Sequence, residues 1–480
     1  MTESQETDAA ASATADKRTL HEFRLDHTTV EDEEELDIVA QELSLFLRRG
    51  EFGAVKGFFV VQEIADIASL FAHMEPDYAL LAMRQLDRTD QAEIFGYLKP
   101  SAQVTMAEKM SREELSRLMA AMSHDDRVDF YKALDPKAQE ALLPGLAKAE
   151  REDLRRLAAY EEGTVGAIMT SDYATLPPTL TAPQALDALR RQASDVETVY
   201  TAYVVDAQHR LLGVVSLRDI LLARSRQTVR ETMEPDPVVV QADEEQEEAA
   251  ALIARYDLLA LPVVDGDGRM VGIVTADDAM DVAEEEATED IYKSSNVGEF
   301  EGSVKDASLF SLYRARIVWL VLLVFGNIFS GAGISLFEDT IAANLALLFF
   351  LPLLIGSGGN AGAQSATLMV RALATGDVRA SDWGRLFGRE LAIGLALGLT
   401  MSFAVSLVGI VRAGIDVTVV VALAMTLIVV VGALIGVSLP FVLSRFKLDP
   451  ATASGPLVTS IADVTGVMIY FGIARALLPG

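Results

Sequence analysis

Hydrophobic residues dominate five stretches in the last third of the chain. The five stretches cover residues 317–337, 341–370, 390–411, 417–443 and 452–478. Each is long enough to cross the hydrocarbon core of a bilayer as a helix, which takes about 20 residues. Buried helices of soluble proteins can be equally apolar, but five of them close together favour a membrane domain. The pattern therefore predicts a five-helix, all-α transmembrane domain over residues 314–480.

The short loops around these stretches differ in charge. Basic side chains precede the first stretch and occupy the loops after the second and the fourth: Arg314, Arg316, Arg371, Arg379, Arg385, Arg389, Arg445 and Lys447. The other two loops hold a single basic residue, Arg412, together with Glu338, Asp339 and Asp416. Because short loops rich in Lys and Arg stay in the cytoplasm, we expect a multi-pass protein of the cell membrane with a cytoplasmic N-terminus and an external C-terminus.

Upstream of the membrane domain, the sequence of residues 88–157 predicts a series of short helices. Capping residues open these segments at intervals of 10–12 residues: Thr89, Ser101, Ser111, Ser123 and Asp135. Stacked short helices of this kind form a superhelical domain, which we place at residues 36–160. The first 35 residues lack the apolar core of a signal peptide, and we expect a disordered acidic tail there.

Residues 165–224 and 229–282 repeat one α/β pattern of strand–helix–strand–strand–helix. Met169 matches Met233 at an offset of 64 residues. The later matches, Asp206 with Asp265, Gly213 with Gly272 and Asp219 with Asp278, have an offset of 59 residues. The first copy therefore contains a five-residue insertion near residues 195–201. The repeat resembles a tandem pair of CBS domains, which sense different small ligands in different proteins and do not identify a function alone.

A dense acidic run follows the second copy, over residues 276–293. Positions 278, 281, 285 and 289 fall near one face of the expected helix. Such runs are usually solvated helix surfaces, but hard cations such as Mg2+ also take carboxylate oxygens, often through water. A divalent ion between facing acidic surfaces would offset their repulsion and stabilise a compact arrangement. We expect residues 283–313 to form a helix that connects to the first span.

Charge is distributed unevenly along the chain. There are 40 Lys and Arg and 70 Asp and Glu residues, for a net charge of −30. Residues 314–480 carry 10 basic and 8 acidic side chains, which leaves −32 on residues 1–313. This acidity opposes nucleic acid as a partner and favours multivalent cations. The absence of Cys excludes disulfides and thiolate metal sites, and the lack of a phosphate loop or a Ser/His/Asp grouping argues against an enzyme.

Polar residues inside the apolar stretches suggest a function in the membrane. Asp463 is the only acidic residue deep in such a stretch, and ionisable residues there are costly and are usually functional. The sequence GSGGNAGAQSAT at residues 356–367 combines small residues, which let helices approach closely, with Asn360. Helix packing alone would explain the small residues, but it would not explain Asp463.

The domain order and several motifs together resemble the MgtE family of magnesium channels and transporters. The segments that carry the resemblance are QEIADIASLF, YEEGTVGAIMT, GGNAGAQSATLMVRALATGDV and PLVTSIADVTGVMIYFGIAR. The resemblance covers roughly residues 55–480. It implies a homodimer in the bilayer, in which each chain has a helical N domain, a CBS pair, a connecting "plug" helix and five spans.

The resemblance also implies a pore on the two-fold axis of the dimer. Asp463 of both protomers would hold a largely hydrated Mg2+ ion, with oxygens of Ala462 and Thr459 as helpers and Asn360 nearby. Ala363 departs from the family pattern, in which polar side chains are common at that position. An alanine offers no polar side-chain contact there, and the other positions of the pore pattern are unaffected.

Regulation by cytosolic Mg2+ is a further implication of the resemblance. Ions bound between the N domain, the CBS pair and the plug helix would lock the pore closed. The matching acidic positions are Asp125, Asp126, Asp129, Glu245, Glu247, Asp257, Asp278, Asp281, Glu286, Glu289 and Asp290. Some members bind ATP between the CBS domains. Arg218 and Asp219 suit ribose–phosphate contacts, whereas Thr201 and Leu258 stand where aromatic rings would stack on adenine.

An alternative interpretation is a membrane-anchored ligand sensor that conducts no ions. Asp463 and the small-residue span argue against it. The residues leave open the selectivity among Mg2+, Mn2+, Co2+ and Ni2+, which all accept oxygen ligands. They also leave open the choice between a channel and an ion-coupled carrier, and the number of regulatory ions.

Overall fold

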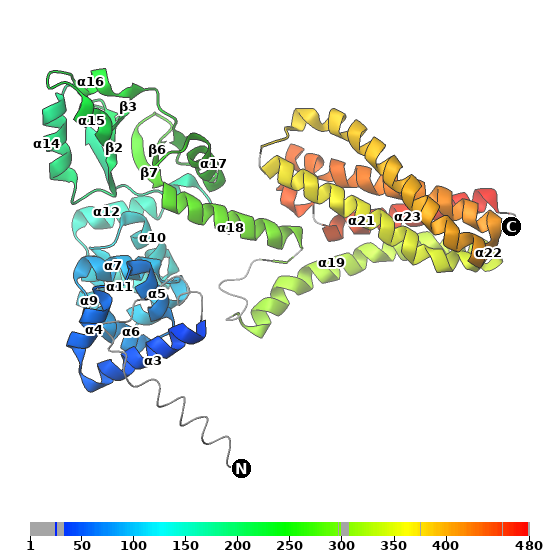
Figure 1. Cartoon of the computed structure of the whole chain (residues 1–480), viewed down its shortest axis with the longest axis horizontal. Coiled ribbons are helices and arrows are strands. Elements are labelled where there is room, and N and C mark those ends of the chain that lie inside the picture. Colours follow the sequence, from blue (N-terminus) through cyan, green and yellow to red (C-terminus); the bar gives the residue numbers. More distant parts are fainter. Residues whose placement is uncertain are drawn as a thin grey trace, which may run out of the picture. The chain divides into compact units, whose positions relative to one another are not determined.

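The computed structural model describes residues 25, 33–295, 297–298, 307–374, 376–453 and 455–478 (Figure 1). Contacts group the chain into two compact units, Met1–Ala283 and Glu284–Gly480. The predicted acidic tail, residues 1–35, lies outside the described residues except for residue 25 and residues 33–35, which begin the first helix. Residues 299–306 of the predicted connecting segment also lie outside them.

The first unit opens with a stack of mostly short helices. These are α3 (Glu33–Arg49), α4 (Phe52–Phe59), α5 (Ile64–Ala72), α6 (Pro76–Met83), α7 (Arg88–Tyr97), α8 (Pro100–Ala107), α9 (Arg112–Met119), α10 (His124–Ala133), α11 (Pro136–Leu142), the 3-10 turn η2 (Leu143–Gly145) and α12 (Lys148–Leu157). Their apolar faces share one core, in which the rings of Phe95 and Phe130 meet edge to face with centroids 5.1 Å apart. The predicted helical N domain is therefore confirmed.

The capping pattern that predicted these helices is only partly right. Ser111 and Asp135 each accept backbone N–H groups at the start of a helix, at 3.2 and 2.8 Å. At α7 the cap is Asp87, which accepts the N–H of Asp90 at 3.1 Å, and not Thr89. Both Asp and Thr favour the cap position, so the pattern alone could not choose between two candidates this close together.

The two repeat copies build two small sheets. The elements around the first sheet are α13 (Val165–Ile168), β1 (Tyr173–Leu176), α14 (Ala182–Gln192), β2 (Thr198–Val205), β3 (Leu211–Ser216), α15 (Leu217–Leu222), α16 (Val229–Thr232) and β4 (Glu234–Pro235). The second sheet contains β5 (Val240–Gln241), β6 (Ala260–Val264) and β7 (Met270–Thr275), with α17 (Gln246–Tyr256) between β5 and β6. Strand orders are β1-β2-β3-β4 and β5-β6-β7. In each sheet the first pair is parallel and the next antiparallel, which confirms the predicted α/β repeat.

The two glycines that the repeat aligned occupy the same place in their sheets. Gly213 pairs with Val204 and Gly272 pairs with Val263. A Cβ on Gly213 would lie 2.4 Å from a backbone oxygen of a neighbouring segment, and one on Gly272 would lie 2.8 Å from another. Close backbone approach therefore explains why both copies carry glycine here.

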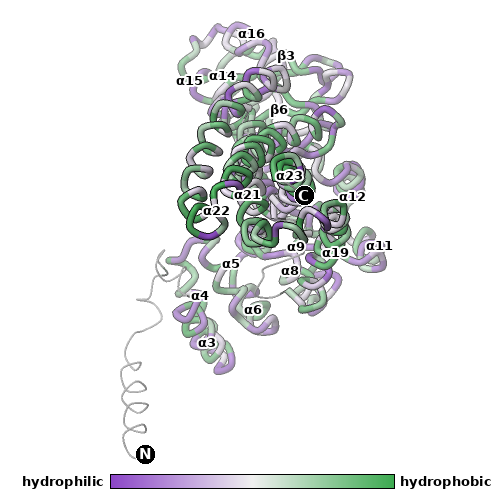
Figure 2. The backbone as a smooth tube through the Cα atoms, turned by 90° about the vertical axis from the view of Figure 1, so that its right-hand side faces the viewer, coloured by the Kyte–Doolittle hydropathy of each residue, from purple (hydrophilic) through white to green (hydrophobic). Residues whose placement is uncertain are grey.

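The second unit is built from long apolar helices. Its elements are α19 (Leu309–Ser335), α20 (Glu338–Ala343), α21 (Ala346–Ala374), η3 (Ala380–Asp382), α22 (Trp383–Arg445), η4 (Pro450–Thr452) and α23 (Gly455–Leu477), and it also holds the C-terminal half of α18 (Ala276–Ser294), which begins in the first unit. Within the described residues, α19, α21, α22 and α23 are long and apolar enough to cross a membrane. Figure 2 shows the hydrophobic positions that run along α21, α22 and α23.

Helix α22 contains two of the five predicted spans. Its 63 residues would extend ~95 Å at 1.5 Å per residue, far more than the ~30 Å of a bilayer core. Gly414 interrupts it with φ 78° and ψ 176°, a conformation that favours glycine. The legs on either side fold against each other, and the hydroxyl of Thr426 in the second leg lies 3.4 Å from the backbone oxygen of Gly398 in the first. The hairpin therefore supplies the third and fourth apolar segments.

We expect Gly398→Leu to disrupt this hairpin. A Cβ at Gly398 would lie 2.8 Å from the backbone oxygen of Thr426, so a larger side chain must separate the legs at a cost of about 1–3 kcal/mol. The yield of monodisperse protein and its melting temperature should both fall. Gly388→Leu is the matched control, because no atom lies within 4 Å of a Cβ built there. Equal behaviour of the two variants would contradict this packing.

Candidate metal sites

An acidic cluster forms in the first unit where α10 faces the start of α18. Asp125 and Asp126 lie in the first turn of α10, and Asp277 and Asp278 lie in the first turn of α18. Asp281 follows one turn later and couples electrostatically to Asp126. The structure therefore brings together predicted site residues that are more than 150 positions apart in the sequence.

Asp125 is the least satisfied member of this cluster. Its Oδ1 atom is buried and has no hydrogen-bond partner within the described chain. Burial, and then the carboxylates of Asp278, Asp126 and Glu197, raise the pKa of Asp125 well above its usual range. A buried oxygen without a donor costs free energy, and a cation or a proton would remove that cost.

Glu197 joins the same cluster, although it was not among the predicted site residues. Its backbone N–H donates to the oxygen of Asp172 at 2.8 Å, which fixes the segment before β2. The side chain as a whole stays exposed, yet local desolvation and the nearby Asp278 and Asp172 raise its pKa to about 7. The insertion at residues 195–201 was the sequence signal that could have identified Glu197.

Asp278 and Asp219 show how the repeat diverges. Each accepts the hydroxyl of the residue three positions earlier, Thr275 and Ser216. Asp219 is exposed beside the exposed Arg218, and its carboxylate accepts the hydroxyl hydrogen bond of Ser216, which is the N-cap residue of α15. For Asp278, burial raises the pKa to about 6 despite the hydrogen bond from Thr275. The equivalent position therefore belongs to the acidic cluster only in the second copy.

His124 positions α10 against the first CBS copy. Its Nδ1 atom lies 2.9 Å from Asp153 Oδ2 and 3.2 Å from Asp172 Oδ1. Ser171 donates to the same Asp153 oxygen at 2.8 Å. Burial would raise the pKa of Asp153, but the hydrogen bonds from His124 and Ser171 outweigh it and hold that pKa well below its usual range. This network orients the turn that presents Asp125.

Other predicted regulatory residues lie elsewhere in the first unit. Glu245 precedes α17, Glu247 lies in its first turn and Asp257 follows its last residue with φ 52°. The helix between Glu245 and Asp257 is ~17 Å long at 1.5 Å per residue, so these two carboxylates cannot ligate the same ion. Asp129 lies one turn after Asp125 on α10, and its side chain is exposed.

The C-terminal half of α18 presents a second group of charges in the second unit. Lys293 forms ion pairs with Glu289 on α18 and with Asp449, whose Oδ2 atom lies 2.8 Å from Nζ. Burial, and then Asp449, raise the pKa of Asp290. Glu286 lies one turn before Asp290 on the same helix. The sequence predicted Glu286, Glu289 and Asp290, but it gave no sign of Lys293 or Asp449.

Asp463 is half-buried near the middle of α23. Within the part of the chain that the structure describes, its carboxylate has neither a hydrogen bond nor an ion pair. Thr459 lies one turn earlier on the same face, and its hydroxyl donates to the oxygen of Pro456 at 2.9 Å. Ala462 is buried, and Asn360 on α21 is exposed in the single chain.

The small residues of α21 bring its backbone against two neighbouring helices. A Cβ on Gly359 would lie 3.0 Å from Thr459 Cγ2, and one on Gly362 would lie 2.8 Å from the backbone oxygen of Gly432. Ser365 lies 2.5 Å from a carboxylate oxygen of Glu390 in the first leg of α22. The small-residue stretch therefore packs beside the helix segment that carries Thr459 and Asp463.

None of these groups of side chains has the arrangement of a complete set of metal ligands. Within the described ranges, no three His, Cys, Asp or Glu side chains are close enough together to hold one metal ion. The acidic cluster instead combines partly buried carboxylates with water-accessible ones. Such an arrangement suits an ion that keeps its water shell or one that draws the side chains together.

Comparison with known proteins places this architecture in a family. Residues 351–473 match the family described as a divalent cation transporter, residues 62–163 match the MgtE intracellular N domain, and residues 165–226 and 229–285 match CBS domains. The magnesium transporter MgtE of Thermus thermophilus is 40% identical over 453 residues, which cover 93% of this chain and 99% of that protein. The chain belongs to the MgtE family of magnesium transporters.

A second curated relative fits this assignment to MgtE. The magnesium transporter MgtE of Bacillus subtilis is 31% identical over 440 residues, which cover 90% of this chain and 96% of that protein. A crystal structure of the cytosolic domain of the Mg2+ channel MgtE in complex with ATP is 35% identical. It covers 51% of this chain and 99% of its own, with a TM-score of 0.49. The family consists of transporters and not of enzymes, as the sequence predicted.

Lower stability at higher pH is expected for the metal-free protein. Burial raises the pKa of Asp278 from 3.8 to about 6, and desolvation raises that of Glu197 from 4.5 to about 7. Between pH ~4 and ~7 these two carboxyl groups bind more protons in the folded state than in the unfolded state, so their contribution to stability falls as the pH rises through that range. Thermal unfolding of full-length protein in a chelator, followed by circular dichroism, measures this. Glu197→Gln should reduce the loss of stability above pH 6. An unchanged dependence of the melting temperature on pH would contradict the raised pKa of Glu197.

Proposed function

We propose that the chain is a homodimeric Mg2+ channel for magnesium uptake across the cell membrane. A hydrated Mg2+ ion passes between the two copies and is held by Asp463 from each. The observation that supports this most is the half-buried carboxylate of Asp463, which has no partner in the described chain and lies in an apolar helix. A charge in such surroundings is costly unless another charge or water compensates it, and a second copy with a hydrated cation would supply both.

The contacts in the pore follow from the chemistry of the ion. Mg2+ gives up its waters reluctantly and prefers six oxygens, so outer-shell contacts suit permeation better than a full protein cage. Oxygens of Thr459 and Ala462 accept hydrogen bonds from those waters in this proposal, and Asn360 of α21 is a further candidate. Binding must stay weak enough for release, and few direct ligands keep it weak.

Cytosolic Mg2+ closes this channel by binding to the acidic residues of the soluble part. The buried, unpaired oxygen of Asp125 and the carboxylates that face it from α18 support a regulatory site there. The acidic positions on α17 and on the C-terminal half of α18 are further candidates. Without the ion these carboxylates repel one another, and with it the compact form is favoured, which shifts the population toward the closed state.

Nucleotide binding by the CBS pair is a separate part of the proposal. The carboxylate of Asp219 accepts a hydrogen bond from the Ser216 hydroxyl, whereas the exposed Arg218 is free to contact an ATP phosphate. The proposed orientation in the membrane has the N-terminus in the cytoplasm and the C-terminus outside.

Growth of a bacterial strain that lacks magnesium importers tests transport directly. Expression of the wild-type chain should restore growth at low external Mg2+, and patch recordings should show inward current that falls when internal Mg2+ rises. Failure to restore growth, with the protein present in the membrane, would favour a sensor that conducts nothing.

A further inference from the structure

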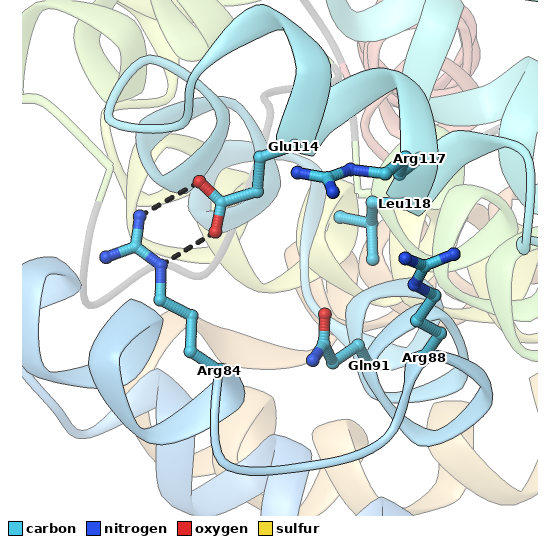
Figure 3. A pocket seen from close by; sticks show the side chains of 6 residues that line it. All are labelled: Arg84, Arg88, Gln91, Glu114, Arg117 and Leu118. Carbon is cyan, nitrogen blue, oxygen red and sulfur yellow. Dashed lines mark hydrogen bonds and ion pairs between the residues drawn. The ribbon is translucent and has the colours of Figure 1, made fainter.

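A basic pocket lies in the helical N domain (Figure 3). Its lining residues come from the C-terminal end of α6 and from α7 and α9, and its volume is about 190 Å3. The lining residues are Arg84, Arg88, Gln91, Glu114, Arg117 and Leu118. None of them belongs to the acidic cluster or to the membrane unit, so the transport proposal leaves this pocket without a role.

The charges in the pocket are only partly compensated. Arg84 donates to both carboxylate oxygens of Glu114, from Nε at 2.7 Å and from Nη2 at 2.9 Å. That pair lowers the pKa of Glu114 and keeps it ionised. Arg88 has no hydrogen-bond or ion-pair partner within the described chain, and Arg117 Nε donates to the backbone oxygen of Glu113 at 3.0 Å. Three guanidinium groups and one carboxylate therefore leave a net charge of +2.

The donors and acceptors favour a particular kind of anion. Figure 3 shows Arg88 and Arg117 on one side of the pocket and the Arg84–Glu114 pair on the other. Guanidinium groups match the oxygens of phosphate and carboxylate groups. The Gln91 amide donates from Nε2 to the oxygen of Leu86 at 2.8 Å, which leaves its Oε1 atom as an acceptor. A ligand with several anionic oxygens and one hydroxyl would satisfy all three residues.

We propose that this pocket binds phosphate, either free or as the terminal group of a phosphomonoester. Arg88 and Arg117 donate to its oxygens, and the Oε1 atom of Gln91 accepts a hydrogen bond from its hydroxyl group. The net charge of −32 on residues 1–313 repels anions at long range, so binding depends on these short-range contacts. An occupied pocket ties the first turn of α7 to α9 and stabilises this part of the N domain.

Titration of full-length protein in detergent with inorganic phosphate tests the proposal. A chelator removes Mg2+, and low salt keeps the screening of charges small. Isothermal titration calorimetry measures the affinity for phosphate. Because each arginine contributes a charge-assisted hydrogen bond, Arg88→Gln and Arg117→Gln should each weaken binding about tenfold. Arg112→Gln on the same helix α9 is the matched control, because Arg112 does not line the pocket, and it should change the affinity less than about twofold. Melting temperatures without phosphate show that each variant folds.

Glu114→Gln distinguishes a binding pocket from a purely structural ion pair. It removes the competing carboxylate and releases Arg84, so phosphate should bind more tightly even though the ion pair is lost. Wild-type protein that binds no phosphate, or a Glu114→Gln variant that binds it less well, would overturn the proposal. Binding that is seen only with nanodiscs of phosphatidylglycerol, and not with free phosphate, would assign the pocket to a lipid headgroup. That result would also overturn the proposal.

Discussion

Asp463→Asn should abolish Mg2+ current while the protein folds and inserts normally. The substitution keeps the shape of the side chain and removes its charge. If two carboxylates hold the permeating ion, both disappear from the dimer at once, and we expect conductance to fall by at least about tenfold because a charged ring sets cation occupancy. Patch recordings of purified, reconstituted protein measure the current, and size-exclusion chromatography checks the assembly.

Two further variants define what the loss of current means. Asp463→Glu restores the carboxylate one methylene further out and should recover part of the current. Thr465→Ala changes a polar residue two positions away, whose hydroxyl donates to the backbone oxygen of Ile461 at 2.8 Å, and should conduct like the wild type. Full current in Asp463→Asn would remove Asp463 from the pore.

Local patterns in the sequence predicted the elements of this protein well. The apolar stretches, the repeat and the acidic run each depend on residues close together in the chain, and each corresponds to described helices or strands. The boundary between the third and fourth spans differs from the prediction, because it lies within helix α22 at the break at Gly414. A loop was expected there because the residues are polar, whereas the backbone needs only one glycine to turn.

Contacts between distant segments were much harder to predict. The pairing of Lys293 with Asp449 joins residues 156 positions apart, and neither has a local signature. Glu197 lies in an insertion whose length was visible but whose position in space was not. The resemblance supplied Asp125 as a candidate, yet the burial of its unpaired oxygen depends on how α10 meets α18, and no periodicity encodes that contact.

The combined substitution Asp125→Asn and Asp278→Asn should uncouple the channel from internal Mg2+. Both carboxyl groups have raised pKa values because they are desolvated and close to like charges. Replacing them with neutral amides should therefore stabilise the metal-free protein, on the order of 2 kcal/mol. The same change removes ligands, so added Mg2+ should no longer raise the melting temperature. In patch recordings the open probability should vary little between low and high internal Mg2+.

Asp219→Asn is the matched control for this substitution. Asp219 occupies the equivalent position in the first CBS copy and accepts the same kind of hydroxyl hydrogen bond, but it is exposed and lies outside the acidic cluster. Its loss should leave inhibition by Mg2+ intact. If the double variant and the control respond to Mg2+ alike, the regulatory ion binds elsewhere, and the charges around Lys293 and Asp449 become the next candidates. If metal-free stability falls in the double variant, the repulsion between these carboxylates is not the force that opens the compact form.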